Sequence, residues 1–128
     1  MKRTRAIFRA LASVTAAHAP GLRFRLSEGD PSDFPKERNF AMCGLLADNE
    51  ANVIVAPKME HEPDAVIHAL LRHEIAHGIL LYHGNEDHSE RDADALAEAV
   101  WGDRLNYDHR DVQTIAPGKH PRPRHLHR

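Results

Sequence analysis

Residues 63–82 read PDAVIHALLRHEIAHGILLY, and the rest of the chain is best understood from this stretch. Its apolar residues, from Val66 to Leu80, recur at steps of three and four, which is the spacing of one face of an α-helix. Pro63 suits the first helical turn, where its missing N–H is not needed. Gly84 follows the run and is typical of a helix end. We therefore predict one long helix over residues 63–82.

The predicted helix carries the motif His73-Glu74-Ile75-Ala76-His77. Because residues four apart lie on one face of a helix, His73 and His77 can direct their imidazoles at a single metal ion. Glu74 is offset toward the neighbouring face, where it can reach a water on that ion. Two neutral imidazoles and an adjacent carboxylate are what hydrolysis by a zinc-bound water requires. The motif specifies only three residues in a chain with 11 histidines, so the surrounding sequence has to support it.

A second helix follows the first after a short loop. Ser89 and Asp92 have the spacing of a capping box, in which each side chain bonds a backbone N–H at the start of a helix. An apolar stripe then continues to Gly102, a typical helix end. We therefore predict a helix over residues 90–101, packed back on the first.

A hydrolytic zinc site needs a third protein ligand and an open fourth position. Candidates lie just after the motif: His83, Glu86, Asp87, His88, Glu90 and Asp94. Glu90 and Asp94 are one turn apart on the second helix, beside the small Ala93 and Ala97. Small residues let two helices approach closely, so a carboxylate there could reach the metal. The residues by themselves leave this choice open.

The two helices together resemble the small gluzincin peptidases of the ImmA/IrrE type. Their pattern is H-E-x-x-H followed by a helix beginning E-x-x-A-[ND]-x-x-A, and residues 90–97 read ERDADALA. The resemblance covers residues 40–101 and implies a zinc metallopeptidase. Its implied ligands for Zn²⁺ are His73, His77 and Glu90, and its implied catalytic base is Glu74.

The resemblance also implies an α+β fold. It would be a small zincin-like domain with an N-terminal helix, a short antiparallel sheet or hairpin, the motif helix and the second helix. The hairpin would consist of Ala41–Leu46 and Asn52–Ala56 around Asp48-Asn49-Glu50, and Leu22–Leu26 would add a short strand. If Asn52–Ala56 is a sheet edge, an extended substrate could pair with it. Members of this family typically act on DNA-binding repressors, and many short members are encoded by phages and other mobile elements. We therefore expect a protein or peptide substrate and no direct binding of nucleic acid.

Two other functional classes fit parts of the sequence. His83 lies ten residues after the first motif histidine, which is the ligand spacing of metzincins and of YbeY-type endoribonucleases. RNA cleavage at a site built from His83 and the two motif histidines is therefore one alternative, although metzincins have a glycine where this chain has Leu80. A non-catalytic zinc-binding accessory protein is the other. His88, or less readily Tyr82, could also donate a hydrogen bond to a tetrahedral intermediate.

Length and composition limit the remaining possibilities. A chain of 128 residues has the size of one ordinary domain. We predict a single zincin-like domain over residues 1–116 and a disordered tail over residues 117–128, which is basic and rich in proline and histidine. The single cysteine, Cys43, excludes an intramolecular disulfide. No apolar run has the length of a membrane span, and we expect a cytoplasmic protein.

Charge is unevenly distributed along the chain. Residues 1–27 contain six Lys/Arg and residues 117–128 contain four, both without acids, so the middle carries a net charge of −12. Such a middle would favour basic substrates or partners. The segment Arg3–Ala17 is rich in arginine, with Ile7 and Val14 near helical spacing. It suits a first helix packed on the fold or a mitochondrial-type presequence, and we expect the packed helix.

Overall fold

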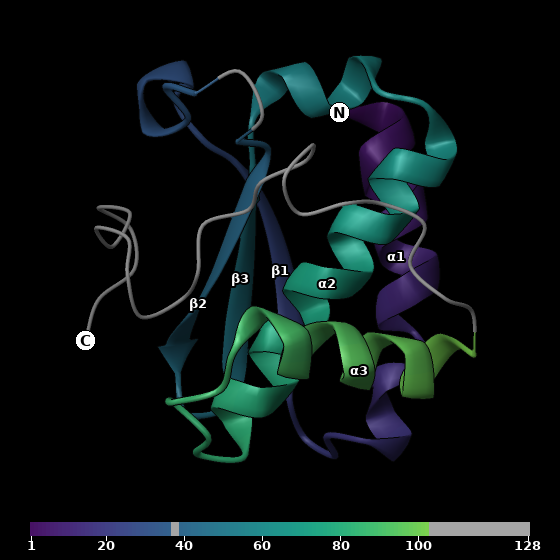
Figure 1. Cartoon of the computed structure of the whole chain (residues 1–128), viewed down its shortest axis with the longest axis vertical. Helices are drawn as coiled ribbons and strands as arrows, with labels where there is room; N and C mark the ends of the chain where they lie inside the picture. Colours follow the sequence, from purple (N-terminus) through teal and green to yellow (C-terminus); the bar gives the residue numbers. More distant parts are fainter. Residues whose placement is uncertain (37–38, 103–128) are drawn as a thin grey trace.

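The computed structural model describes residues 1–36 and 39–102, which form an α+β fold with three α-helices and one three-stranded sheet (Figure 1). The helices are α1 (Lys2–Ala12), α2 (Asp64–Tyr82) and α3 (Glu90–Trp101). The strands are β1 (Arg23–Glu28), β2 (Ala41–Ala47) and β3 (Glu50–Val55). Short 3-10 helices span Thr15–Ala17 (η1), Pro31–Asp33 (η2) and Pro57–His61 (η3). The expected α+β class is confirmed, whereas the end of the predicted domain, residues 103–116, and the predicted tail, residues 117–128, lie outside the described residues.

The sheet is mixed, with the strand order β1-β3-β2. Strands β2 and β3 form the predicted antiparallel hairpin around Asp48-Asn49, with a register shift between Leu45 and Ala47. Strand β1, however, pairs in parallel with β3, so the expectation of a purely antiparallel sheet is wrong. The reason is that the chain reverses direction twice between them, once before β2 and once after it, and therefore enters β3 in the direction of β1.

Strand β3 lies at the centre of the sheet, where both of its edges are hydrogen-bonded. The suggestion that a substrate could pair with Asn52–Ala56 is therefore wrong. Five of the six residues of β3 are buried, as expected for a strand that is covered on both faces. Within residues 1–36 and 39–102, β2 pairs with β3 alone and is an edge strand.

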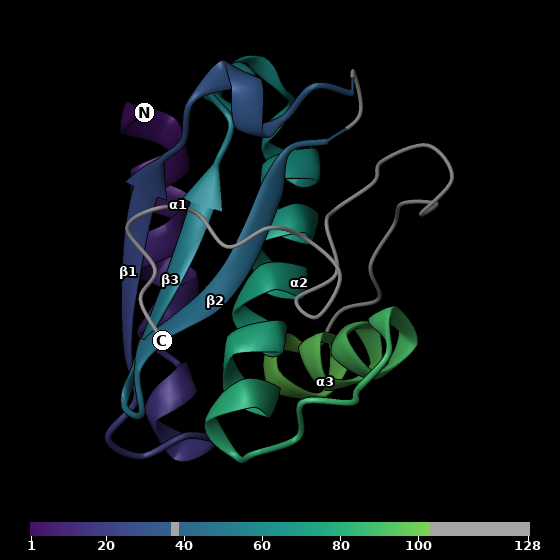
Figure 2. The ribbon, with the colours of Figure 1, turned by 90° about the vertical axis from the view of Figure 1, so that its left-hand side faces the viewer.

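Helices α1 and α2 cover the same face of the sheet (Figure 2). The main core lies between these layers, and its members include Phe8, Leu11, Val53, Val55, Leu70, Leu71 and Ile75. A smaller apolar cluster lies on the opposite face, and its buried members are Phe34, Met42, Ile54 and Ala56. Gly78 lets α2 rest close to the sheet, since a Cβ at this position would lie 2.7 Å from the ring of Phe24. None of the helices in the described ranges is both long enough and apolar enough to span a bilayer.

Helix α1 is the predicted N-terminal helix, but it ends at Ala12 rather than Ala17. The hydroxyl of Ser13 donates to the carbonyl oxygen of Ala10 at 2.7 Å, which favours a turn over continued helix. Phe8 and Leu11 face the core, whereas Val14, which was expected on the apolar stripe, is 46% exposed. The segment is therefore an integral layer of the fold.

The start of α1 is held by Glu60 of η3. Its carboxylate accepts hydrogen bonds from the backbone N–H groups of Arg3 and Thr4 and from the Thr4 hydroxyl. These bonds, with those of Thr4 the strongest, lower the pKa of Glu60 from 4.5 to about 2.

The two predicted helices around the motif are confirmed. Pro63 caps α2, which begins one residue later than expected. The capping box at the start of α3 is formed, because Ser89 and Asp92 each accept a bond from the other's backbone N–H, at 3.1 and 2.9 Å. Gly102 ends α3 with φ of 82°, a left-handed conformation that glycine adopts without strain.

Candidate metal centre

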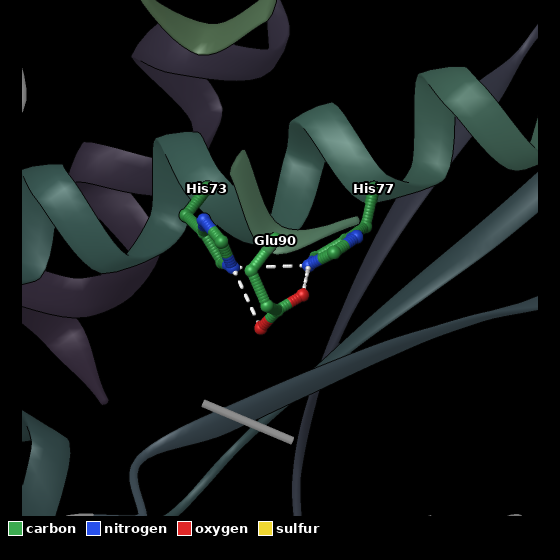
Figure 3. A group of neighbouring side chains, drawn as sticks. All are labelled: His73, His77 and Glu90. Carbon is green, nitrogen blue, oxygen red and sulfur yellow. Dashed lines mark hydrogen bonds and ion pairs between the residues drawn. The ribbon is translucent and has the colours of Figure 1, made fainter. Parts of the chain in front are cut away.

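The two motif histidines lie side by side on α2, and both are fully buried. Their Nε2 atoms are 2.9 Å apart. Glu90, the first residue of α3, meets both of them across the helix interface (Figure 3). Its Oε1 lies 3.3 Å from Nε2 of His73, and its Oε2 lies 2.8 Å from Nε2 of His77. One nitrogen from each histidine and one oxygen from Glu90 therefore gather within 4.8 Å of one another.

Close packing of α3 on α2 brings Glu90 to this position. The fully buried side chains of this interface are small, Ala76, Ala93 and Ala97, and the partly buried Leu80, Leu96 and Trp101 pack against them. The capping box of Ser89 and Asp92 fixes the start of α3 at Glu90. Glu90 therefore lies in the first turn of α3, opposite the two histidines.

The donor set and its spacing suit a metal ion. Ligand atoms at 2.0–2.2 Å from a tetrahedral zinc lie roughly 3.4 Å from one another. The contacts, at 2.9, 3.3 and 2.8 Å, are somewhat shorter than this spacing, and the two Glu90 contacts are made by different oxygens of its carboxylate. His73, His77 and Glu90 could therefore bind a metal ion. Two imidazole nitrogens and a carboxylate oxygen suit zinc and also several other divalent ions, so this donor set does not determine which metal binds.

Asp94 holds the far side of the His73 ring. Its Oδ1 is 2.7 Å from Nδ1 of His73, the atom that points away from the cluster. Burial by itself would lower the pKa of His73, but the hydrogen bonds to Asp94 and Glu90 outweigh it and raise that pKa to about 10. Asp94, which was also a candidate third ligand, therefore contacts the side of the His73 ring that faces away from the cluster.

His77 has the opposite electrostatic character. Burial lowers its pKa to about 4; Glu90 opposes this shift, while the charge of His73 adds to it. For Glu90, burial would raise the pKa, but its side-chain contacts with both histidines hold it well below its usual range.

Glu74 completes the buried group. It follows His73 on α2 and is fully buried. Its negative charge raises the pKa of His73.

The other candidates on the α2–α3 loop have different positions. His83 lies with its Nε2 2.8 Å from the carbonyl oxygen of His18, and the Tyr82 hydroxyl donates to the carbonyl oxygen of Pro20. Both contacts tie the end of α2 to the segment before β1 and lie outside the cluster.

Glu86 and Asp87 are exposed and are not part of the cluster, and His88 contacts the Nδ1 side of His77. The sequence named Asp94 and His88 as possible ligands or donors but did not reveal that they contact the outer, Nδ1 sides of the His73 and His77 rings. The spacing of Asp94, one turn after Glu90, was the sequence signal from which its contact with His73 could have been inferred.

Compared with protein-family models, with curated proteins and with solved structures, the chain gives no match.

Proposed function

We propose that this chain is a zinc-dependent metallopeptidase of the gluzincin type, as its resemblance to ImmA/IrrE-type peptidases implies. The observation that carries the proposal is the meeting of His73, His77 and Glu90 next to the buried Glu74. Three donors alone would describe a metal-binding site. The adjacent carboxylate adds the base that peptide hydrolysis needs.

In this proposal His73 and His77 hold the ion through Nε2 and Glu90 holds it through its carboxylate. Three protein ligands leave a fourth position for the reaction, as in hydrolytic rather than structural zinc sites. Zinc held there supplies a Lewis acid that lowers the pKa of water and polarises a carbonyl group. Asp94 keeps the His73 ring in place through its bond to Nδ1.

Glu74 moves the proton. It accepts the proton of the water that attacks the scissile carbonyl carbon, and it returns that proton to the amine nitrogen as the C–N bond breaks. Both histidines are fully buried, whereas the Glu90 side chain is 32% exposed, so substrate approaches from the side of Glu90. Burial of Glu74 keeps bulk water away from the proton that it carries.

The substrate in this proposal is a peptide in extended conformation. Strand β2 offers an edge for it, because β2 pairs only with β3 in the described part of the chain and packs against α2. A regulatory protein such as a DNA-binding repressor is the substrate class that the family resemblance suggests, by analogy. The endoribonuclease alternative needs His83 as a ligand, and the bond of His83 to the His18 carbonyl favours Glu90 instead.

Zinc content tests the ligand set. We expect about one zinc per chain in the wild type by elemental mass spectrometry, and a large loss in Glu90→Ala. His83→Ala is the matched control and should keep its zinc. Zinc retained in Glu90→Ala and lost in His83→Ala would contradict the gluzincin assignment and make RNA the first substrate to try. A folded wild type without zinc, even after refolding with the metal, would remove the proposal.

Glu74→Gln tests the chemistry. The variant should bind zinc like the wild type, because Glu74 is not a ligand, and should lose about 10²–10⁴-fold in hydrolysis. The substrate is a proteome-derived peptide library, with new N-termini read by mass spectrometry. Glu86→Gln, an exposed glutamate on the loop, is the control. Cleavage by Glu74→Gln at the wild-type rate would contradict the role of Glu74 as base.

A further inference from the structure

His88, on the loop between α2 and α3, lies directly behind the ligand His77. Its Nε2 is 2.6 Å from Nδ1 of His77, and the two ring centroids are 4.8 Å apart. On its other side, Nδ1 of His88 is 2.6 Å from the backbone carbonyl oxygen of Asn85. A carbonyl and two imidazoles therefore form a chain of hydrogen bonds that ends at the metal centre.

The carbonyl determines where the protons lie along this chain. The oxygen of Asn85 can only accept, so Nδ1 of His88 must donate. A neutral imidazole carries one N–H, so Nε2 of His88 is then an acceptor. Nδ1 of His77 must therefore carry its proton, and the lone pair of His77 resides on Nε2. That atom is the one that faces His73 and Glu90.

We infer that His88 is a positioning residue, which fixes the tautomer and the ring orientation of His77 so that Nε2 is presented to the metal. This inference rests on the proposed function, because it takes His77 to be a metal ligand. Partners that bond the outer nitrogen of a ligand histidine strengthen metal binding and are normally carboxylates, carbonyls or waters. His88 performs the same task with a ring that is itself oriented by a carbonyl.

The choice of an imidazole rather than a carboxylate as partner fits the charges around the centre. Asp94 already supplies a carboxylate behind His73, and Glu74 and Glu90 supply two more. A further carboxylate behind His77 would add negative charge to a buried group. His88 orients the ring without adding any.

The loop holds His88 and Asn85 in a defined relation. The N–H of Asn85 donates to the carbonyl oxygen of Leu80 at 3.0 Å, which anchors the loop to the last turn of α2. Ser89, the next residue after His88, is the cap of α3 and anchors the other end. Both ends of the loop segment that carries His88 are thus attached to helices.

Zinc affinity of loop variants tests the inference, using the full chain and competition with a chromophoric chelator. His88→Leu should weaken zinc binding about 10–100-fold, the usual effect of removing such a partner. His88→Gln keeps an acceptor oxygen near the place of Nε2 and should restore most of that loss. His83→Leu makes the same chemical change at an exposed histidine of the same loop and should leave zinc binding unchanged.

Nuclear magnetic resonance of the ¹⁵N-labelled, zinc-loaded wild type measures the hydrogen bond directly and does not depend on any variant folding. We expect a proton on Nδ1 of His77 and a scalar coupling between that nitrogen and Nε2 of His88. A proton on Nε2 of His77, or no coupling, would overturn the inference. Wild-type zinc affinity in His88→Leu would overturn it while leaving the proposed function intact. A folded wild type that binds no zinc would overturn both.

Discussion

Replacing Ala97 with leucine tests whether the close packing of α2 and α3 positions the candidate metal centre. Ala97 is fully buried between these helices, together with Ala76 and Ala93. Leucine adds three carbon atoms at a position that has no solvent-exposed side, and overpacking of this kind costs about 1–3 kcal/mol. Alanine and leucine have similar helix propensities, so packing dominates the effect. We expect the free energy of unfolding to fall by about 1–3 kcal/mol.

Ala97→Leu should weaken zinc binding more than its effect on the free energy of unfolding suggests. Glu90 stands on α3, and its oxygens lie 3.3 and 2.8 Å from the two histidine nitrogens. Metal–ligand bonds tolerate deviations of about 0.2 Å. A displacement of α3 by on the order of 1 Å, part of the width of the added group, exceeds this tolerance several times. Zinc affinity should therefore fall by at least about tenfold.

Ala99→Leu is the matched control, because Ala99 is exposed on the same helix. Urea unfolding and chelator competition are measured on both variants and on the wild type. Ala99→Leu should stay within about 0.5 kcal/mol of wild-type stability. If Ala97→Leu and Ala99→Leu gave the same stability and the same zinc affinity, close helix packing would not be what positions Glu90.

Three further predictions concern single contacts. Asp94→Ala should weaken zinc binding about 10–100-fold and Asp94→Asn less, because asparagine keeps an acceptor for Nδ1 of His73; chelator competition measures both. Glu60→Gln should lower stability at neutral pH. Because the folded-state pKa of Glu60 is about 2 rather than 4.5, its contribution is complete above pH 4.5 and is lost as the pH falls toward 2, so urea unfolding should show the two proteins converging over that range. Gly78→Ala should destabilise the chain in thermal unfolding, since a methyl group 2.7 Å from the ring of Phe24 costs about 1–3 kcal/mol, against a gain of about 1 kcal/mol in helix propensity.

Each of these predictions has an outcome that contradicts it. Wild-type zinc affinity in Asp94→Ala would remove the role of Asp94 behind the ligand ring. A stability difference for Glu60→Gln that stays constant from neutral pH to pH 2 would mean that the lowered pKa does not stabilise the fold. A Gly78→Ala variant that is more stable than the wild type would mean that Phe24 moves aside freely.

The helices around the motif were predictable because local sequence specifies them. Apolar spacing and Pro63 define α2, and the capping box and Gly102 define α3 to the residue. The parallel partner of β1 was not predictable, because the pairing of Arg23 with Glu50 depends on two reversals of the chain that no local pattern encodes. The end of α1 was missed because the apolar spacing continues to Val14, whereas the helix gives way to a turn at Ser13.

The candidate centre, too, was predictable only in part from the sequence. Helical spacing alone brings His73 and His77 together. The sequence offered several donors after the motif, and the path of the loop and the packing of α3 on α2 determine which of them faces the histidines. Glu90 faces the histidine nitrogens, whereas Asp94 and His88 face the outer sides of the rings. Such a distinction is a matter of tertiary geometry, so residue type and spacing could not supply it.

The residues of the candidate centre lie close together in the sequence, and this affects the order in which the protein folds. The contacts described above among His73, His77, His88, Glu90 and Asp94 join residues 4 to 21 positions apart, within α2, α3 and the loop between them. Docking of α1 depends instead on contacts across 57 positions at Arg3 and 90 positions at Trp101. Because closing a short loop loses less chain entropy than closing a long one, α2 and α3 should associate first. A metal ion could then be captured by this helix pair and stabilise it before the N-terminal helix completes the core.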